Sequence, residues 1–120
     1  ETGPLLVPVG PGGGRGGPTV SLHGIEMPHE RIAAFCRANG IRRLALFGSI
    51  LRGDFRPESD VDMLVEFLPG VRVGYLAVAR MTRELTDIIG HSVDLRTPAE
   101  LHPVFRERVM KEAVSEYVAP

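Results

Sequence analysis

The stretch "LFGSILRGDFRPESDVDMLVEF", residues 46–67, decides the fold because it carries a turn, a charged loop and a strand. In its second half apolar and polar residues alternate, a period of two that predicts a β-strand over "VDMLVEF". One face would carry Val61, Met63, Val65 and Phe67, and the other Asp60, Asp62, Leu64 and Glu66. Because an unpaired buried carboxylate is costly, the two aspartates at the start of this strand need a chemical reason.

Asp60 and Asp62 are two residues apart, so a strand would place both carboxylates on one face, about 6 to 7 Å from each other. No Lys or Arg occupies an adjacent same-face position to offset their repulsion. A divalent cation would offset it, and oxygen ligands without His or Cys favour Mg²⁺ or Mn²⁺. The alternative is that Asp60 caps a turn after Ser59 while Asp62 faces solvent. The pair alone does not decide between these interpretations.

A third carboxylate and a Gly-Ser pair add to the case for a metal. Asp94 lies in the short apolar segment "SVDLR", residues 92–96, which is predicted to be a strand beside the first. Three carboxylates can hold two metal ions about 3.5 to 4 Å apart, as in nucleotidyl transfer. Gly48 and Ser49 follow a strand, where glycine lets the backbone approach phosphate closely. Most Gly-Ser pairs are only turns.

Outward from this stretch, helices and strands alternate. Apolar spacing, capping residues and turn residues predict helices over 28–40, 73–90 and 97–118 and strands over 41–48, 61–67 and 92–96. Thr97 and Glu100, with Pro98 between them, form the capping pattern of the last helix, with a kink expected at Pro103. This order predicts an α/β (α+β) fold in which helices pack on a small mixed β-sheet.

The first 26 residues have a different composition. Seven Gly and four Pro fall among the first twenty residues, which predicts a disordered Gly/Pro-rich leader over 1–26. The folded domain is then expected over 27–120, with Met27 as the natural start. A chain of 120 residues is long enough for one such domain.

Composition limits the function classes. Apolar residues make up 43% and charged residues 24%, and the net charge of −1 gives no case for DNA or a membrane as partner. Without a bilayer-spanning apolar run or a signal-peptide pattern, a cytoplasmic location is expected. The single Cys36 shares a helix face with Ile32 and Phe35, which predicts a core thiol. The four histidines, His23, His29, His91 and His102, lack metal-ligand spacing and are expected at the surface or at helix ends.

The spacing of these residues resembles a known signature. Gly48-Ser49, then ten residues, then Asp60-Val-Asp62 is similar to the motif of the DNA polymerase beta nucleotidyltransferase superfamily. The string "FGSILRGDFRPESDVDMLVEF" and the later "VDLRTPAEL" resemble the minimal nucleotidyltransferases, the MntA-type antitoxins that are paired with HEPN-domain toxins. The resemblance covers roughly residues 27–118 and implies the polymerase-beta-like nucleotidyltransferase fold.

The resemblance implies a role for each matching residue. Gly48 and Ser49 would hold the triphosphate of ATP, with Arg52 and Ser59 as further nucleotide-binding positions. Asp60 and Asp62 would coordinate two Mg²⁺ ions, and Asp94 would complete the metal site and help to deprotonate the incoming hydroxyl. For Arg52, an ion pair with Asp54 or Glu58 remains the alternative.

The resemblance also implies a reaction and a partner. AMP would pass from ATP to a tyrosine of a cognate HEPN RNase toxin and silence it, with a toxin hetero-oligomer as the expected assembly. About 94 residues complete the catalytic core, so the acceptor is expected to come from another chain. Two alternatives remain: transfer to a small molecule or an RNA 3′ end, and a non-catalytic antitoxin that acts by binding. The intact carboxylates argue against the second.

Overall fold

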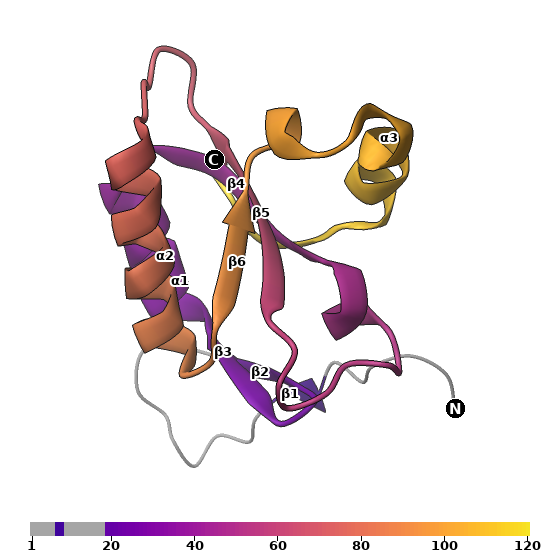
Figure 1. Ribbon diagram of the computed structural model, residues 1–120. Helices are drawn as coiled ribbons and strands as arrows, with labels where there is room; N and C mark the ends of the chain where they lie inside the picture. The colour runs from indigo at the N-terminus through magenta and orange to yellow at the C-terminus, as the bar shows by residue number, and fades with distance from the viewer. Residues whose placement is uncertain (1–6, 9–18) are drawn as a thin grey trace.

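The computed structural model describes residues 7–8 and 19–120 and centres on a four-stranded mixed sheet. The strands run in the order β6 (Val93–Arg96), β5 (Val61–Phe67), β4 (Ile41–Phe47) and β7 (Val114–Val118). β4 pairs antiparallel with both of its neighbours, whereas β5 and β6 are parallel. The predicted mixed sheet is confirmed. Its two parallel strands, β5 and β6, contain Asp62 and Asp94 of the predicted site (Figure 1).

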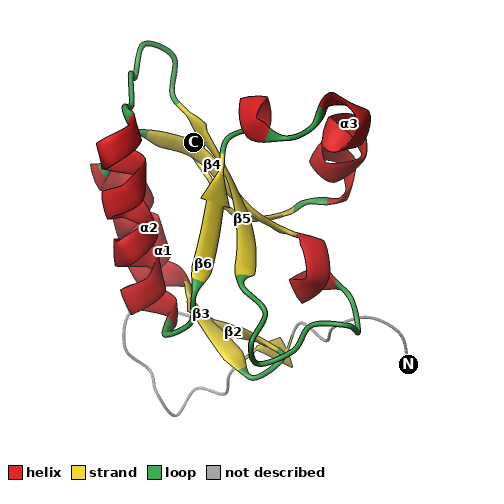
Figure 2. Cartoon of the chain, viewed as in Figure 1, coloured by secondary structure: helices red, strands yellow, loops and turns green. Residues whose placement is uncertain are grey.

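Helical elements cover the sheet on both faces (Figure 2). α1 (His29–Ala38) and α2 (Tyr75–Ile89) pack side by side on one face. The other face carries two short 3₁₀ helices, η2 (Gly48–Leu51) and η3 (Pro98–Glu100), together with α3 (Pro103–Glu112). The predicted α+β fold is therefore confirmed.

The alternation along β5 divides the core in two. Val61, Met63 and Val65 are buried in the larger cluster, which includes side chains of α1 and α2. Leu64 points the other way and packs with Ala45 and Leu101 in a smaller cluster that Val109 and Met110 of α3 adjoin. The face predicted for Asp62 is thus the one that η2, η3 and α3 cover only in part.

The helix ends follow their capping residues. α2 ends at Gly90, whose φ of 76° is left-handed and whose N–H donates to the Thr86 carbonyl at 2.8 Å. The Glu100 carboxylate accepts from the Thr97 N–H at 2.9 Å, which confirms the predicted capping pattern. The capped element is however the single turn η3 and not a long helix.

The helix predicted over 97–118 is wrong in its extent. Leu101 and His102 are extended, a second helix begins at Pro103, and it ends at Glu112. The final residues "VSEYV" form β7, because their β-branched and aromatic side chains suit an edge strand that buries Tyr117 against β4. Helical spacing in the sequence did not show this change of period.

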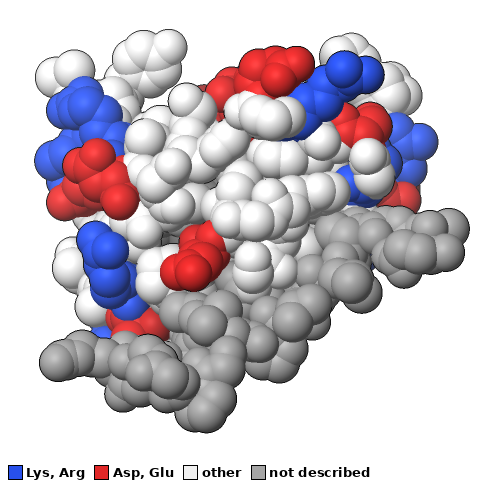
Figure 3. All heavy atoms as spheres, turned by 90° about the horizontal axis from the view of Figure 1, so that it is seen from below, with Lys and Arg blue, Asp and Glu red and all other residues white. Residues whose placement is uncertain are grey.

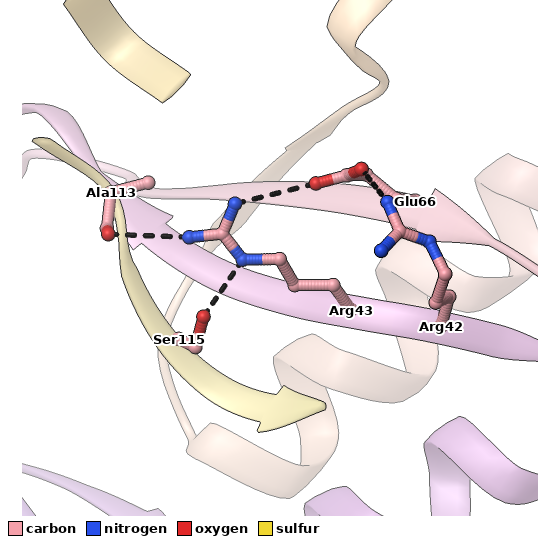
Figure 4. A network of polar contacts seen from close by, with 5 residues as sticks. All are labelled: Arg42, Arg43, Glu66, Ala113 and Ser115. Atoms are coloured by element: carbon pink, nitrogen blue, oxygen red, sulfur yellow. Dashed lines mark hydrogen bonds and ion pairs between the residues drawn. The ribbon is translucent and has the colours of Figure 1, made fainter. Parts of the chain in front are cut away.

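A polar network holds β7 and the end of α3 to the sheet (Figure 4). The Arg43 guanidinium on β4 donates from Nε to Ser115 Oγ at 2.7 Å and from Nη2 to the Ala113 carbonyl at 3.3 Å. Its Nη1 lies 3.4 Å from Glu66 on β5, and Glu66 also pairs with Arg42. One side chain therefore joins three neighbouring segments of the molecule.

A small second sheet precedes α1. It contains β1 (Val7–Pro8), β2 (Thr19–Leu22) and β3 (Ile25–Pro28), and Leu22 and Met27 are fully buried in the larger core. Folded structure therefore begins before Met27, and residues 19–26 are not a disordered leader. The remainder of that prediction concerns residues 1–6 and 9–18, which lie outside the described part of the chain.

Candidate active site

The turn after β4 brings its backbone against the β5 carboxylate. Gly48 begins η2 with φ of 78°, in the left-handed region that favours glycine. A Cβ built at this position would overlap Asp62 Oδ2. Only glycine therefore satisfies both conditions, and the Gly48-Ser49 turn lies directly beside the Asp62 carboxylate.

The parallel pairing of β5 and β6 brings two of the predicted carboxylates together. Asp62 and Asp94 are register partners, and Asp60 lies immediately before β5. Burial, followed by the charges of Asp94 and Asp60, raises the pKa of Asp62 to about 6, although Arg96 and Arg52 act in the opposite direction. Burial and two acidic neighbours thus disfavour the charged form of Asp62.

Asp94 already has a cationic neighbour. Its Oδ2 accepts from both Nε and Nη2 of Arg96 at 3.2 Å, two residues along the same strand. Both side chains are partly exposed, so water screens the pair and its contribution to stability is small. An exposed ion pair of this kind can be exchanged when a stronger cation arrives.

The carboxylates fit a divalent cation in chemistry but are not preassembled around one. Within residues 7–8 and 19–120, no three His, Cys, Asp or Glu side chains stand close enough to be a ready ligand set. Burial, and after it the charges of Asp94 and Asp60, nevertheless raises the pKa of Asp62. A bound cation would offset both effects, and carboxylate oxygens suit Mg²⁺. Both Arg96 contacts use Oδ2 of Asp94, so Oδ1 of the same carboxylate remains available to a cation.

Arg52 and Ser59 lie in the loop between η2 and β5 and make local contacts. Arg52 Nε is 3.3 Å from Asp54 Oδ1, the ion pair named above as the alternative, and both side chains are exposed. Ser59 closes a turn with Arg56, because its Oγ accepts the Arg56 N–H at 3.1 Å and its N–H donates to the Arg56 carbonyl at 2.9 Å. Neither side chain contacts Asp62.

Three ring side chains beside this loop were not expected from the sequence. His23, Phe55 and His91 lie in contact, with centroids 5.0 and 5.5 Å apart in successive pairs. They come from three separate segments, so no local spacing could have indicated them. Only the tertiary fold shows that two of the four scattered histidines flank the loop that leads to Asp60.

The end of the molecule at which β6 begins is seen in Figure 3, and its charges are mixed. Acidic and basic side chains are interspersed with uncharged ones on this face, with no broad basic surface among the coloured residues. In the described chain, no helix combines the length and apolarity needed to cross a bilayer.

Comparison with known proteins finds relatives of this chain. Residues 30–115 match the family model described as the nucleotidyltransferase domain, a range that includes Gly48, Ser49 and the three aspartates. A protein of Methanocaldococcus jannaschii, provisionally named a protein adenylyltransferase, is 37% identical over 85 residues. The alignment covers 71% of this chain and 89% of that relative.

Solved structures agree with the fold. One, provisionally described as a minimal nucleotidyltransferase, is 36% identical with a TM-score of 0.59, over 72% of this chain and 86% of the other. A toxin–antitoxin structure with AMP-PNP has a TM-score of 0.62 at 20% identity, and the match covers 78% of this chain and 75% of the other. A complex of tri-AMPylated Shewanella oneidensis HEPN toxin with MNT antitoxin has a TM-score of 0.55 at 19% identity, and the match covers 76% of this chain and 70% of the other. At such identities the last two show the fold alone.

Proposed function

The chain belongs to the nucleotidyltransferase domain family, and we propose that it transfers AMP from ATP to a tyrosine hydroxyl of a HEPN-domain toxin, as the antitoxin of that toxin. The observation that carries the proposal is the contact of the Gly48 turn with Asp62, which is itself paired in register with Asp94. A phosphate-binding turn and a pair of crowded carboxylates at one edge of a sheet suit nucleotidyl transfer.

The proposed site divides its work among these residues. Gly48 and the Ser49 hydroxyl would bind oxygens of the triphosphate, since the backbone is open to close approach there. Asp60, Asp62 and Asp94 would hold two Mg²⁺ ions, whose charge stabilises the negative charge that builds up on the phosphate oxygens. Arg52 would exchange its exposed ion pair with Asp54 for a phosphate oxygen, whereas the Ser59 hydroxyl, which closes a turn with Arg56, would reach the nucleotide only if that turn opened.

The proposed transfer is an in-line displacement. The tyrosine oxygen forms a bond to the α-phosphorus of ATP, and the bond from that phosphorus to the α,β-bridging oxygen breaks. Pyrophosphate leaves with the electron pair, and the tyrosine proton passes to the Asp94 carboxylate. Holding both reactants in line supplies much of the acceleration in reactions of this type.

The partner is inferred from named relatives and not from a surface of this chain. One structural neighbour is an MNT antitoxin bound to an AMPylated HEPN toxin, and the Methanocaldococcus relative is provisionally named for protein adenylylation. Transfer to an RNA 3′ end is less favoured, because the net charge of −1 gives the chain no overall attraction for RNA.

Intact-mass spectrometry tests the proposal. The protein is mixed with a HEPN-domain protein of the same genome, ATP and Mg²⁺, and the mass of each chain is followed. We expect AMP units on the partner, none after chelation of Mg²⁺, and none with the D60N/D62N double variant. An unmodified partner whose RNase activity is still suppressed by that double variant would instead identify a non-catalytic antitoxin.

A further inference from the structure

The β2–β3 hairpin reaches the loop that connects η2 to β5. Leu22 and Ile25 are register partners at its end, so His23 and Gly24 form a two-residue turn. Their φ values of 52° and 78° are those of a type I′ turn, whose twist suits a hairpin. Because Leu22 is buried in the larger core, the turn holds the His23 ring in a defined place.

His23 contacts the first end of the loop. Its Nε2 lies 3.1 Å from the carbonyl oxygen of Ile50, the residue that follows Ser49. A carbonyl can only accept, so Nε2 carries the proton and donates. The hairpin is thereby tied to η2, directly beside the proposed phosphate-binding turn.

His91 contacts the opposite end of the loop. Its Nε2 lies 2.6 Å from the carbonyl oxygen of Ser59, the residue that precedes Asp60. The same reasoning makes Nε2 the donor. Two imidazoles from distant parts of the sequence therefore hold the two backbone positions that flank the loop.

Phe55, in the middle of the loop, links the two imidazoles. Its ring centroid is 5.0 Å from that of His23 and 5.5 Å from that of His91, with tilted planes, a favourable arrangement for aromatic pairs. The three rings line an open hollow of about 320 Å³, and Phe55 also packs against the edge of the larger core. Replacing a histidine should therefore loosen the loop with little effect on the core, whereas replacing Phe55 also removes some packing.

We propose that His23, Phe55 and His91, the aromatic clasp, are positioning residues that fix the loop between Gly48 and Asp60 for nucleotide binding. The inference rests on the proposed function of Gly48, Ser49 and Asp60. The β2–β3 hairpin lies before residues 30–115, the range that matches the family. In this proposal the hairpin helps to position the site. Without the clasp, the segment between Gly48 and Asp60 would lose its contacts with the two imidazoles, although the pairing of Phe47 with Asp62 would still hold its ends.

Hydrogen exchange of the nucleotide-free protein tests whether the clasp holds the loop. His23→Asn removes the ring and keeps a residue that tolerates positive φ, whereas His29→Asn is a matched control at the start of α1. We expect amide exchange in residues 48–60 to become about fivefold faster in His23→Asn, as for the loss of one hydrogen bond. α2 should be unchanged, and His29→Asn should match the unaltered protein.

Two Phe55 variants separate ring stacking from general packing. Phe55→Tyr keeps the aromatic ring and should retain slow exchange, whereas Phe55→Leu should behave like His23→Asn. In calorimetry with AMP-PNP and Mg²⁺, we expect both loosened variants to bind severalfold more weakly. Unchanged exchange in His23→Asn and Phe55→Leu, or equal acceleration across the whole chain, would overturn the clasp. A failure of the unaltered protein to bind AMP-PNP would instead count against the proposed function, since the exchange experiment needs no nucleotide.

Discussion

Two features of the structure require glycine at residue 48: its backbone is left-handed, and the Asp62 side chain lies close to it. We expect Gly48→Ala to lower the free energy of unfolding by about 1–2 kcal/mol through strain alone. Its Cβ should also displace the Asp62 carboxylate and abolish AMP transfer. Urea unfolding and the transfer assay measure the two effects.

Gly70→Ala is the matched control for that variant. Gly70 has φ of 85°, and a Cβ there would meet no described atom within 4 Å. It should lose similar stability and keep its activity. Equal loss of activity in both variants would mean that strain, and not the contact with Asp62, explains the effect of Gly48→Ala.

Asp62 should make stability depend on pH. Its raised pKa of about 6 means that the folded protein holds the proton more tightly than the unfolded chain. Unfolding stability should therefore fall as pH rises from about 4 to 6, and then stay level as far as this group is concerned. Asp62→Asn removes the cost of burying a charged carboxylate. It should raise the free energy of unfolding by about 1 kcal/mol at pH 8, after allowance for solvent screening, and change it little at pH 4.

Urea unfolding without added metal at the two pH values measures this difference. Mg²⁺ provides a second comparison, because binding to the folded state stabilises it by mass action. The ion should stabilise the unaltered protein at pH 8 and have a smaller effect on Asp62→Asn. An equal gain from the substitution at pH 4 and pH 8 would contradict the assignment of the effect to the Asp62 charge.

At the scale of elements, the attachment of β7 depends more on Arg43 than on Arg42. Arg43 is 19% exposed and bonds Ser115, the Ala113 carbonyl and Glu66, whereas Arg42 is 47% exposed and pairs with Glu66 alone. We expect Arg43→Met to lower the unfolding free energy by about 1–2 kcal/mol and Arg42→Met by less than about 1 kcal/mol. Urea denaturation of the two variants measures the difference, and a reversed order would contradict the network as drawn in Figure 4.

The sequence predicted correctly the elements in which apolar residues recur with one clear period, either that of a strand or that of a helix. β5 has strict alternation, and α2 has helical spacing with a glycine at its end, so both were located closely. β7 was missed because a helix begins at Pro103 and its apolar spacing continues into "VSEYV". In the folded protein these residues pair with β4 and form a strand instead. The β2–β3 hairpin was missed because the surrounding Gly and Pro obscured a short strand pair that buries Leu22.

At the scale of the whole molecule, residues came together that local patterns could not relate. The motif spacing predicted Gly48, Ser49, Asp60 and Asp62 as site residues, and the apolar neighbours of Asp94 in "SVDLR" added the third carboxylate. The spacing could not show that His23 and His91 flank the loop. Those two contacts depend on the place of the hairpin and on the pairing of β6 with β5.

The single cysteine reports on the stability of the whole molecule. Cys36 is fully buried among core side chains, and that burial raises its pKa to about 12, so at pH 8 the native protein holds almost no reactive thiolate. We expect a disulfide reagent such as Ellman's reagent to modify Cys36 only when the larger core opens. The rate should then rise with urea in parallel with global unfolding.

The unfolded chain is the control, because it should react at the rate of a free thiol and with one equivalent of reagent. Met81→Ala should speed the reaction of the native protein, since it leaves a cavity in the same core and lowers the free energy of unfolding by about 2–5 kcal/mol. Arg42→Met, at the surface, should change the rate little. Fast modification of the native protein without urea would show that α1 opens locally, and the larger core would then not be a single cooperative unit.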